Sequence, residues 1–453
     1  MNYQQYPAYT WEAQFSILLW SNNEKTLLQK QKFLYSILIK NLKCNVMINK
    51  NRLFLASCFA LITTAFAFAI RAGIMNDLAK DFHLTDTQLG WINFMGAFGF
   101  PIATLVGGPL YNSLGPKKLG WVAWTCHFLG ITFSIMSGSF MPLFLSTFFV
   151  SFANGMVEAA YNPMIADMYE ENTPKMLNRF HVWFPGGLAI GSLIALFLTK
   201  MGGTWQMKIA FMYIPWAIYG FLFYGQQFPK TSNEMDKAST ASNLKAILTS
   251  PLYLFMLVCM VMTATTELGT QSWVERILGA SGAQPLLVLF LVTGLMAIGR
   301  LFAGPIIHKL SIPGILLASA IVSLLGIYLM STASGGMVYL AAIMFAIGVC
   351  FFWPNMISFI AVYLPKTGAL GMSLIGGVGM VGLAICQPII GRWLDSAKAS
   401  AAASGLTGDA MELAAGRATL DNIAWFPMIL IIAFGALFFM RKKLGGGQNV
   451  AAH

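Results

Sequence analysis

The sequence predicts an all-α membrane protein of twelve transmembrane helices, arranged as two parallel six-helix repeats. Three observations lead to this fold class. Apolar residues make up 57% of the 453 residues and charged residues only 10%, against roughly 45–50% and about 25% in soluble globular proteins. The apolar residues form long runs of about 20 residues, the length that crosses a bilayer. Short motifs of the first half recur in the same order in the second half.

The apolar runs divide the chain into two sets of six spans, separated by a polar linker. We expect spans near 53–75, 88–111, 119–138, 142–166, 178–200, 206–228, 251–278, 285–308, 312–332, 336–363, 369–394 and 422–440. The predicted units are a tail (1–46), a first half (47–228), a linker (229–250), a second half (251–444) and a C-terminal tail (445–453). Met47 opens a short basic lead into the first span, which favours Met47 as the start of translation. The polar stretch 395–421 reads as a long outer loop.

The basic residues predict the orientation. With the N-terminus inside, the inner segments hold more than twice as many Lys and Arg residues as the outer ones, as the positive-inside rule requires. We therefore expect an integral protein of the inner or plasma membrane with both termini in the cytoplasm. These residues fall in short loops and at the chain ends, which argues against nucleic-acid binding. The cysteines form no CxxC pair and predict neither disulfides nor a metal site.

Three pairs of motifs indicate the internal repeat. They stand at nearly constant spacing, and a path between two such repeats is where a transported solute would pass. The matched pairs are Phe152-Ala153-Asn154-Gly155 with Phe345-Ala346-Ile347-Gly348, Gly108-Pro109-Leu110 with Gly304-Pro305-Ile306, and Gly186-Gly187 with Gly376-Gly377; the first pair also places Asn162 opposite Asn355.

The loop after the second span carries a family resemblance. It runs from Gly108 to Lys118 and resembles the signature loop of the major facilitator superfamily, with glycines and closing lysines, although Asn112 and Ser113 stand where that family has Asp and Arg. This resemblance covers nearly everything after Met47. It implies a secondary transporter that works by alternating access between its two halves.

A narrower resemblance points to the fucose–proton symporter family. Its fourth helix is similar to the run from Glu158 to Pro163, and its next loop is similar to Leu177–His181. Its seventh helix has a glutamate followed by a tryptophan, as in Glu267 and Trp273. The resemblance implies symport of a sugar with a proton. The fucose permease also has an acidic residue in its first helix, where this sequence has none.

Glu158 and Glu267 are the acidic residues that fall well inside a span. An ionised group there costs several kcal/mol, so it needs a partner, water or a proton. At helical spacing, Asn154 and Asn162 share a stripe with Glu158, and Gln271 shares one with Glu267. We interpret Glu158 as the proton-coupling residue. The predicted solute ligands are Asn154, Asn162, Glu267, Gln271, Trp273 and Asn355.

Other interpretations stay open. The same polar groups could simply join helices by hydrogen bonds. Arg71 and Arg300 could instead make an organic-anion carrier, for a sugar acid for example, although snorkelling of Arg71 to the outer surface and a structural pairing of Arg300 are the simpler readings. His127 is isolated in the sequence.

The fold could also serve a non-transporting sensor or scaffold. The sequence has no phosphate-binding loop or other enzyme motif, and we expect no cofactor and no metal. We expect a monomer whose partners are a sugar-like solute, protons and lipid.

Overall fold

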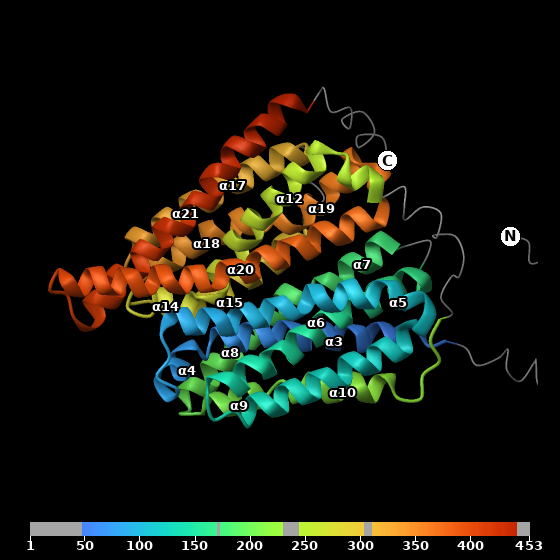
Figure 1. Cartoon of the computed structure of the whole chain (residues 1–453), viewed down its shortest axis with the longest axis horizontal. Helices are drawn as coiled ribbons and strands as arrows, with labels where there is room; N and C mark the ends of the chain where they lie inside the picture. Colours follow the sequence, from blue (N-terminus) through green and yellow to red (C-terminus); the bar gives the residue numbers. More distant parts are fainter. Residues whose placement is uncertain (1–47, 170–172, 230–243, 303–309, 442–453) are drawn as a thin grey trace, which may run out of the picture. The chain divides into compact units, whose positions relative to one another are not determined.

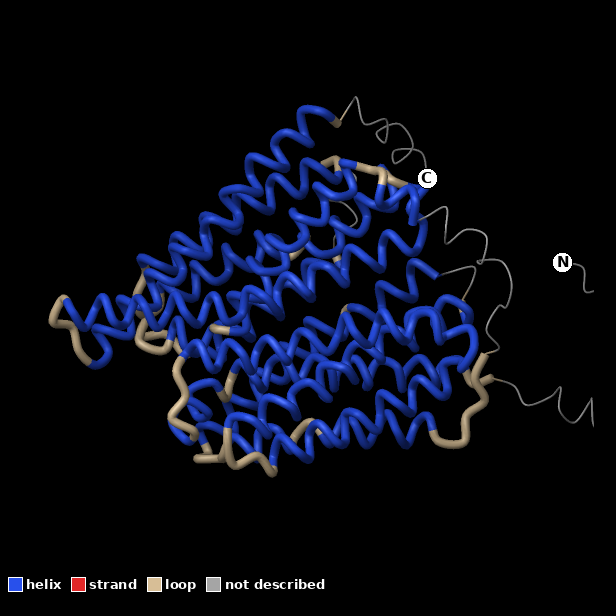
Figure 2. The backbone as a smooth tube through the Cα atoms, viewed as in Figure 1, coloured by secondary structure: helices blue, strands red, loops and turns tan. Residues whose placement is uncertain are grey.

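The computed structural model describes residues 48–169, 173–229, 244–302 and 310–441. The predicted tail 1–46, most of the linker, the Gly304-Pro305-Ile306 motif and the C-terminal tail lie outside the described residues. The chain divides into two compact units, of which Lys50–His453 contains nearly everything described below. Figure 2 shows only helices and loops in the described part of the chain.

The first set of helices is the N-terminal half of the bundle (Figure 1). It comprises α3 (Lys50–Ala72), α4 (Met75–Asp81), α5 (Asp86–Ile135), α6 (Phe140–Met168), α7 (Thr173–His181), α8 (Trp183–Lys200), α9 (Trp205–Ala210) and α10 (Tyr213–Phe223). A capping box formed by Thr85 and Gln88 fixes the start of α5. Helix α5 contains two predicted spans, divided at Gly115, whose φ of 75° no helical residue adopts.

The second set is the C-terminal half (Figure 1). It comprises α12 (Pro251–Ala264), the π-helical turn η2 (Thr265–Gly269), α13 (Thr270–Ser272), α14 (Val274–Leu278), α15 (Pro285–Leu301), α17 (Ile312–Thr332), α18 (Met337–Val349), α19 (Phe352–Tyr363), the 3₁₀ turn η3 (Pro365–Thr367), α20 (Gly368–Ala403) and α21 (Gly408–Met440). Ser250 and Ser311 cap α12 and α17, each followed by a proline in the first turn.

Each predicted span contains one or more helices among the described residues. In the described residues, nine helices are long and apolar enough to cross a membrane. The remaining three predicted spans correspond to the part of α5 after Gly115, to α9 and α10, and to α15, whose helix is shorter. The polar stretch 395–421 is not a loop: α20 continues to Ala403 and α21 begins at Gly408, so helix fills most of it.

The two halves meet closely where α5 passes α20. A Cβ atom on Gly90 of α5 would lie 2.6 Å from the backbone of Pro388 in α20, and one on Gly391 would overlap the carbonyl oxygen of Asp86. Only glycine allows backbones to approach this closely. The contact joins the start of α5 to the middle of α20, and this end of the bundle is called the Asp86 end below.

Candidate functional site

Glu158 lies on α6 and is held by neighbours from its own half. Its carboxylate accepts a hydrogen bond from the Asn162 side chain one turn later. The Nε2 atom of His181, at the end of α7, lies 4.0 Å from the same oxygen. The side chain of Glu158 is 17% exposed, whereas that of His181 is 46% exposed. The cluster therefore connects a carboxylate inside the bundle to a histidine that reaches solvent.

Asn154 does not join this cluster. Its amide oxygen lies 2.9 Å from Nε2 of His127, whose Nδ1 atom lies 2.9 Å from the hydroxyl of Tyr219. Asn154 and His127 are fully buried. The predicted stripe thus splits: Asn162 and Glu158 meet, while Asn154 points into the packing between α6, α5 and α10. His127, which is isolated in the sequence, thus finds its partners Asn154 and Tyr219 on other helices.

Glu267 lies in the π-helical turn η2 and pairs with Arg300 of α15. The two side chains are 3.1 Å apart, and Arg300 also donates a hydrogen bond to the carbonyl oxygen of Cys350. The pairing of Arg300 with a carboxylate and with backbone was predicted. Glu267 is only 3% exposed and is more deeply buried than Glu158. Its second oxygen, Oε2, has no hydrogen-bond partner in the described part of the chain.

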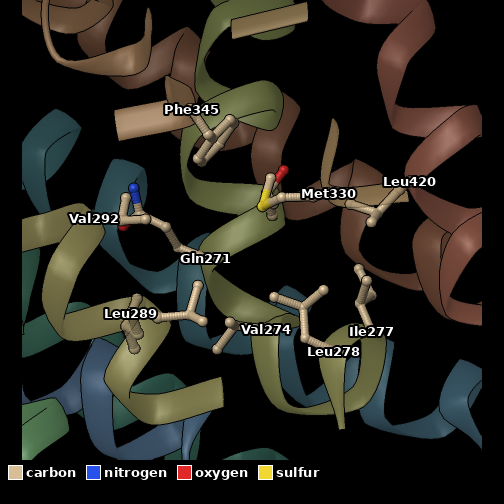
Figure 3. Close-up of a pocket in the computed structure, with 11 residues that line it drawn as sticks. Gln271, Val274, Ile277, Leu278, Leu289, Val292, Met330, Phe345 and Leu420 are labelled. Atoms are coloured by element: carbon tan, nitrogen blue, oxygen red, sulfur yellow. The ribbon is translucent and has the colours of Figure 1, made fainter. Parts of the chain in front are cut away.

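Gln271 separates two cavities. One lies within the C-terminal half, where Figure 3 shows Gln271 among apolar neighbours such as Val292 and Met330; its volume of about 20 Å³ is room for about one water molecule. The other lies between the halves, lined by Phe68 and Leu188 on one side and by Gln271 and residues near it on the other; its volume of about 10 Å³ in this conformation is room for no more than one water molecule. Gln271 donates only a weak bond to sulfur, from Nε2 to Met296 at 3.5 Å, so its amide remains available to a ligand.

Trp273 and Asn355 are satisfied within the C-terminal half. Trp273 is fully buried, and its indole nitrogen donates to Gln387 over 2.7 Å. Asn355 is 2% exposed and donates to the carbonyl oxygen of Phe351, one turn earlier on the same segment. In this conformation neither side chain faces the cavity between the halves.

Arg71 does not snorkel. It is 9% exposed, and its guanidinium lies 4.9 Å from the ring centre of Phe68 on the same helix. The guanidinium rests against Gly96 of α5, where a Cβ atom would overlap Nη1. Gly96 is more than two turns inside α5, so the charge lies well below the end of the helix. The simpler reading of Arg71 from the sequence was therefore wrong.

A network of charges that the sequence did not reveal joins the halves at the Asp86 end. The side chain of Asp86 is 1% exposed and receives Arg276 at 2.6 Å and Lys398 at 2.8 Å, both from the C-terminal half. Asp395 of α20 in turn accepts from the backbone N–H groups of Asp86, at 3.0 Å, and Thr87, at 2.8 Å.

Two further bonds extend this network. Glu275 accepts from the backbone N–H of Asn76, and Arg276 donates to the Asn76 side chain. In the described residues, all hydrogen bonds and ion pairs between the halves lie at this end. The signal in the sequence was the presence of charges of both signs near helix ends, but their pairing depends on the tertiary fold.

Comparison with solved structures places this architecture. The chain is similar to a mutant form of the nucleoside transporter NupG, with a TM-score of 0.67 and 14% identity over 86% of this chain and 99% of that one. It is similar to a D-xylose–proton symporter, with a TM-score of 0.67 and 13% identity over 83% of this chain and 96% of that one. It is also similar to a bacterial homologue of the human lysosomal transporter Spinster in an inward-facing, unoccupied conformation. The TM-score is 0.69 and the identity 14%, over 87% of this chain and 97% of that one.

At such low identity these likenesses show the fold alone. No curated protein matches the sequence closely enough to count as a relative. The family model described as Major Facilitator Superfamily matches residues 55–386, well over half of the chain. The chain therefore belongs to the Major Facilitator Superfamily, and it is a membrane transporter rather than an enzyme.

Proposed function

We propose that the protein imports a small polar solute, a monosaccharide or a derivative of one, together with a proton. The two halves alternate access to a site between them, and Glu158 carries the proton. The proposed location is the inner or plasma membrane, with a monomeric chain and both termini in the cytoplasm. The narrow sequence resemblance to fucose–proton symporters supports this choice of solute class.

The contrast between Glu267, which is buried, and Glu158, which is partly buried, carries the proposal. Arg300 lies 3.1 Å from Glu267, so that carboxyl group has a cationic partner. Glu158 has no Lys or Arg partner among the described residues and touches only Asn162 and His181. A carboxylate inside a membrane bundle without a permanent cation has to take up a proton when water is excluded. His181, which is nearly half exposed, offers that proton a route to solvent.

Polar groups near the cavity between the halves support a hydroxyl-rich solute. Gln271 lines this cavity, and the free Oε2 atom of Glu267 is a buried acceptor one turn away. A sugar hydroxyl both donates and accepts, so it could satisfy both groups. A buried acceptor left unpaired costs roughly 1–3 kcal/mol, which a solute would recover on binding.

Replacing Glu158 by Gln tests the coupling. Glutamine keeps the shape and hydrogen bonds of the protonated acid but cannot release a proton. In proteoliposomes with an acidified exterior, wild-type protein should concentrate its solute, whereas the Glu158→Gln variant should not accumulate it. The variant should still exchange labelled for unlabelled solute, because that step needs no change of protonation. Asp409→Asn, at an exposed position, is the matched control and should accumulate normally.

Two results would refute the proposal. Accumulation against a gradient by Glu158→Gln would show that coupling lies elsewhere, with Glu267 as the next candidate. A complete lack of uptake across neutral monosaccharides and sugar acids would instead favour the sensor or scaffold interpretation of the fold.

A further inference from the structure

Arg71 differs from the other buried cations of the bundle. Among the described residues it forms no hydrogen bond and no ion pair, although it is only 9% exposed. Four other cations of low exposure lie within 3.1 Å of a carboxylate oxygen. These are Lys208 with Asp77, Arg276 with Asp86, Arg300 with Glu267 and Lys398 with Asp86.

The surroundings of Arg71 hold the charge in place without neutralising it. Gly96 gives the guanidinium room against α5, and the face of the Phe68 ring attracts it at 4.9 Å. One turn before Gly96, on the same face of α5, Asn93 is 1% exposed and its Oδ1 atom is also without a partner among the described residues. A cation–π contact stabilises the guanidinium by less than the burial of an unpaired ion costs.

A ligand between the halves could complete this arrangement. Phe68 and Ala72, which flank Arg71 in α3, line the small cavity between the halves, whose opposite wall includes Gln271; Arg71 itself does not line it in this conformation. A guanidinium presents parallel N–H donors that match a carboxylate, and the bond is stronger where water is excluded. The unpaired Oδ1 atom of Asn93 supplies an acceptor, which suits a hydroxyl beside the carboxylate.

We propose that Arg71 binds a carboxylate of the transported solute, so that the solute is a sugar acid rather than a neutral sugar. The inference rests on the proposed transport function and narrows its substrate class. It also narrows the two-arginine alternative from the sequence, because Arg300 is already neutralised by Glu267. Among the described residues, Arg71 has no carboxylate partner.

The charges agree with proton symport. In the loaded carrier the solute carboxylate balances Arg71 while Glu158 is protonated. In the empty carrier the ionised Glu158 has the opposite charge to Arg71. These groups therefore give neither form a net charge while the carrier switches between its two access states. This matters because moving an uncompensated charge through a closed, dry state is energetically costly.

Matched sugars and their acids test the assignment in purified full-length protein without any pH gradient. The probes are D-galacturonate with D-galactose, D-glucuronate with D-glucose, and L-lactate as a carboxylate that lacks the ring. Binding is measured by calorimetry and by the change in melting temperature for wild type, Arg71→Lys and Arg71→Gln. At least one uronate should bind more than about tenfold tighter than its neutral parent. Arg71→Gln should weaken the binding of that uronate by about 10- to 150-fold, and Arg71→Lys should weaken it by less.

The melting temperature without solute gives an independent readout. Arg71→Gln removes an unpaired buried charge and should leave the melting temperature unchanged or raise it. Lys208→Gln is the control, because Lys208 is buried in the same half but paired with Asp77 at 2.7 Å; this variant should melt lower. If Arg71 had a purely structural role, Arg71→Gln would instead lower the melting temperature, as Lys208→Gln does.

Three outcomes would overturn the inference. They are equal binding of the neutral sugars that survives Arg71→Gln, no binding of any carboxylate in the panel, or a lower melting temperature in Arg71→Gln like that of Lys208→Gln. Failure of the proposed symport is distinguishable from these. Uronate binding that depends on Arg71, combined with no pH-driven accumulation, would refute proton coupling by Glu158 and leave the carboxylate site standing.

Discussion

Replacing Asp395 by Asn removes the negative charge that α20 places at the start of α5. The carboxylate accepts from the N–H groups of Asp86 and Thr87 and from the Thr87 hydroxyl. These are the first residues of α5, where backbone N–H groups have no partner within the helix and the helix dipole is positive. The contact exists only while the two halves are closed at the Asp86 end, so its loss should favour the state that is open there.

The magnitude follows from the contacts that change. An asparagine can accept from one N–H through its oxygen, but its NH₂ group faces the donors of Thr87, which lose their acceptor. Losing a charge-assisted bond and the favourable dipole term costs about 2–3 kcal/mol in a partly buried site. Because 1.36 kcal/mol is a factor of ten, the ratio of open to closed carriers should rise by roughly 30- to 150-fold.

Distances between spin labels can measure this shift. Labels on Met207 of α9 and on Leu406, in the turn between α20 and α21, are exposed and belong to opposite halves. In a background without native cysteines, Asp395→Asn should populate a longer distance that wild type lacks or rarely visits. The control is Glu412→Gln, because Glu412 pairs with Lys398 within the C-terminal half and is 35% exposed. The reasoning fails if Asp395→Asn keeps the wild-type distances, or if Glu412→Gln shifts them equally.

Two more predictions test the packing and the orientation. Asn154→Ala leaves the buried Nε2 atom of His127 unpaired. The variant should therefore lower the free energy of unfolding by about 1–3 kcal/mol, measured by melting, while its affinity for the solute stays the same. A large loss of affinity at unchanged stability would instead show that Asn154 binds the solute. The basic residues predict that a cysteine at Ser239 reacts with an impermeant thiol reagent only from the cytoplasm and one at Ser404 only from outside, and the reverse pattern would overturn the proposed orientation.

The spans were predictable because lipid imposes one simple demand, about 20 apolar residues for each crossing. The exception is the stretch 395–421, where a polar composition suggested a loop. Beyond the membrane a helix needs no apolar run, and the alanines that precede Ser404 have the highest helix propensity of any residue. A hydropathy pattern predicts the part of a helix that lies in the membrane, but it does not predict how far the helix continues beyond the membrane.

The side-chain groupings were less predictable because helical spacing fixes only approximate directions. Two steps of four residues rotate the direction by about 80°, which is enough to send Asn154 toward His127 while Asn162 meets Glu158. Glu267 and Gln271 keep their predicted common face although the backbone between them is π-helical, because both contact α15, at Arg300 and at Met296. Partners from distant helices, such as Arg300 for Glu267, follow from the tertiary fold and leave no local pattern.

The helical hairpin formed by the ends of α20 and α21 would convert a small tilt of α20 into a larger displacement of the hairpin tip. Helix α20 runs unbroken from Gly391, where it touches α5, to Ala403 at the tip, a length of about 18 Å. The ion pair between Lys398 and Glu412 ties its two arms together. A tilt of about 10° in α20 would therefore displace the tip by about 3 Å, by simple geometry on that rise. A rigid protein inserted in the exposed turn near Leu406 would magnify the displacement further, so motions too small to resolve in the bilayer could be followed by single-molecule imaging outside it.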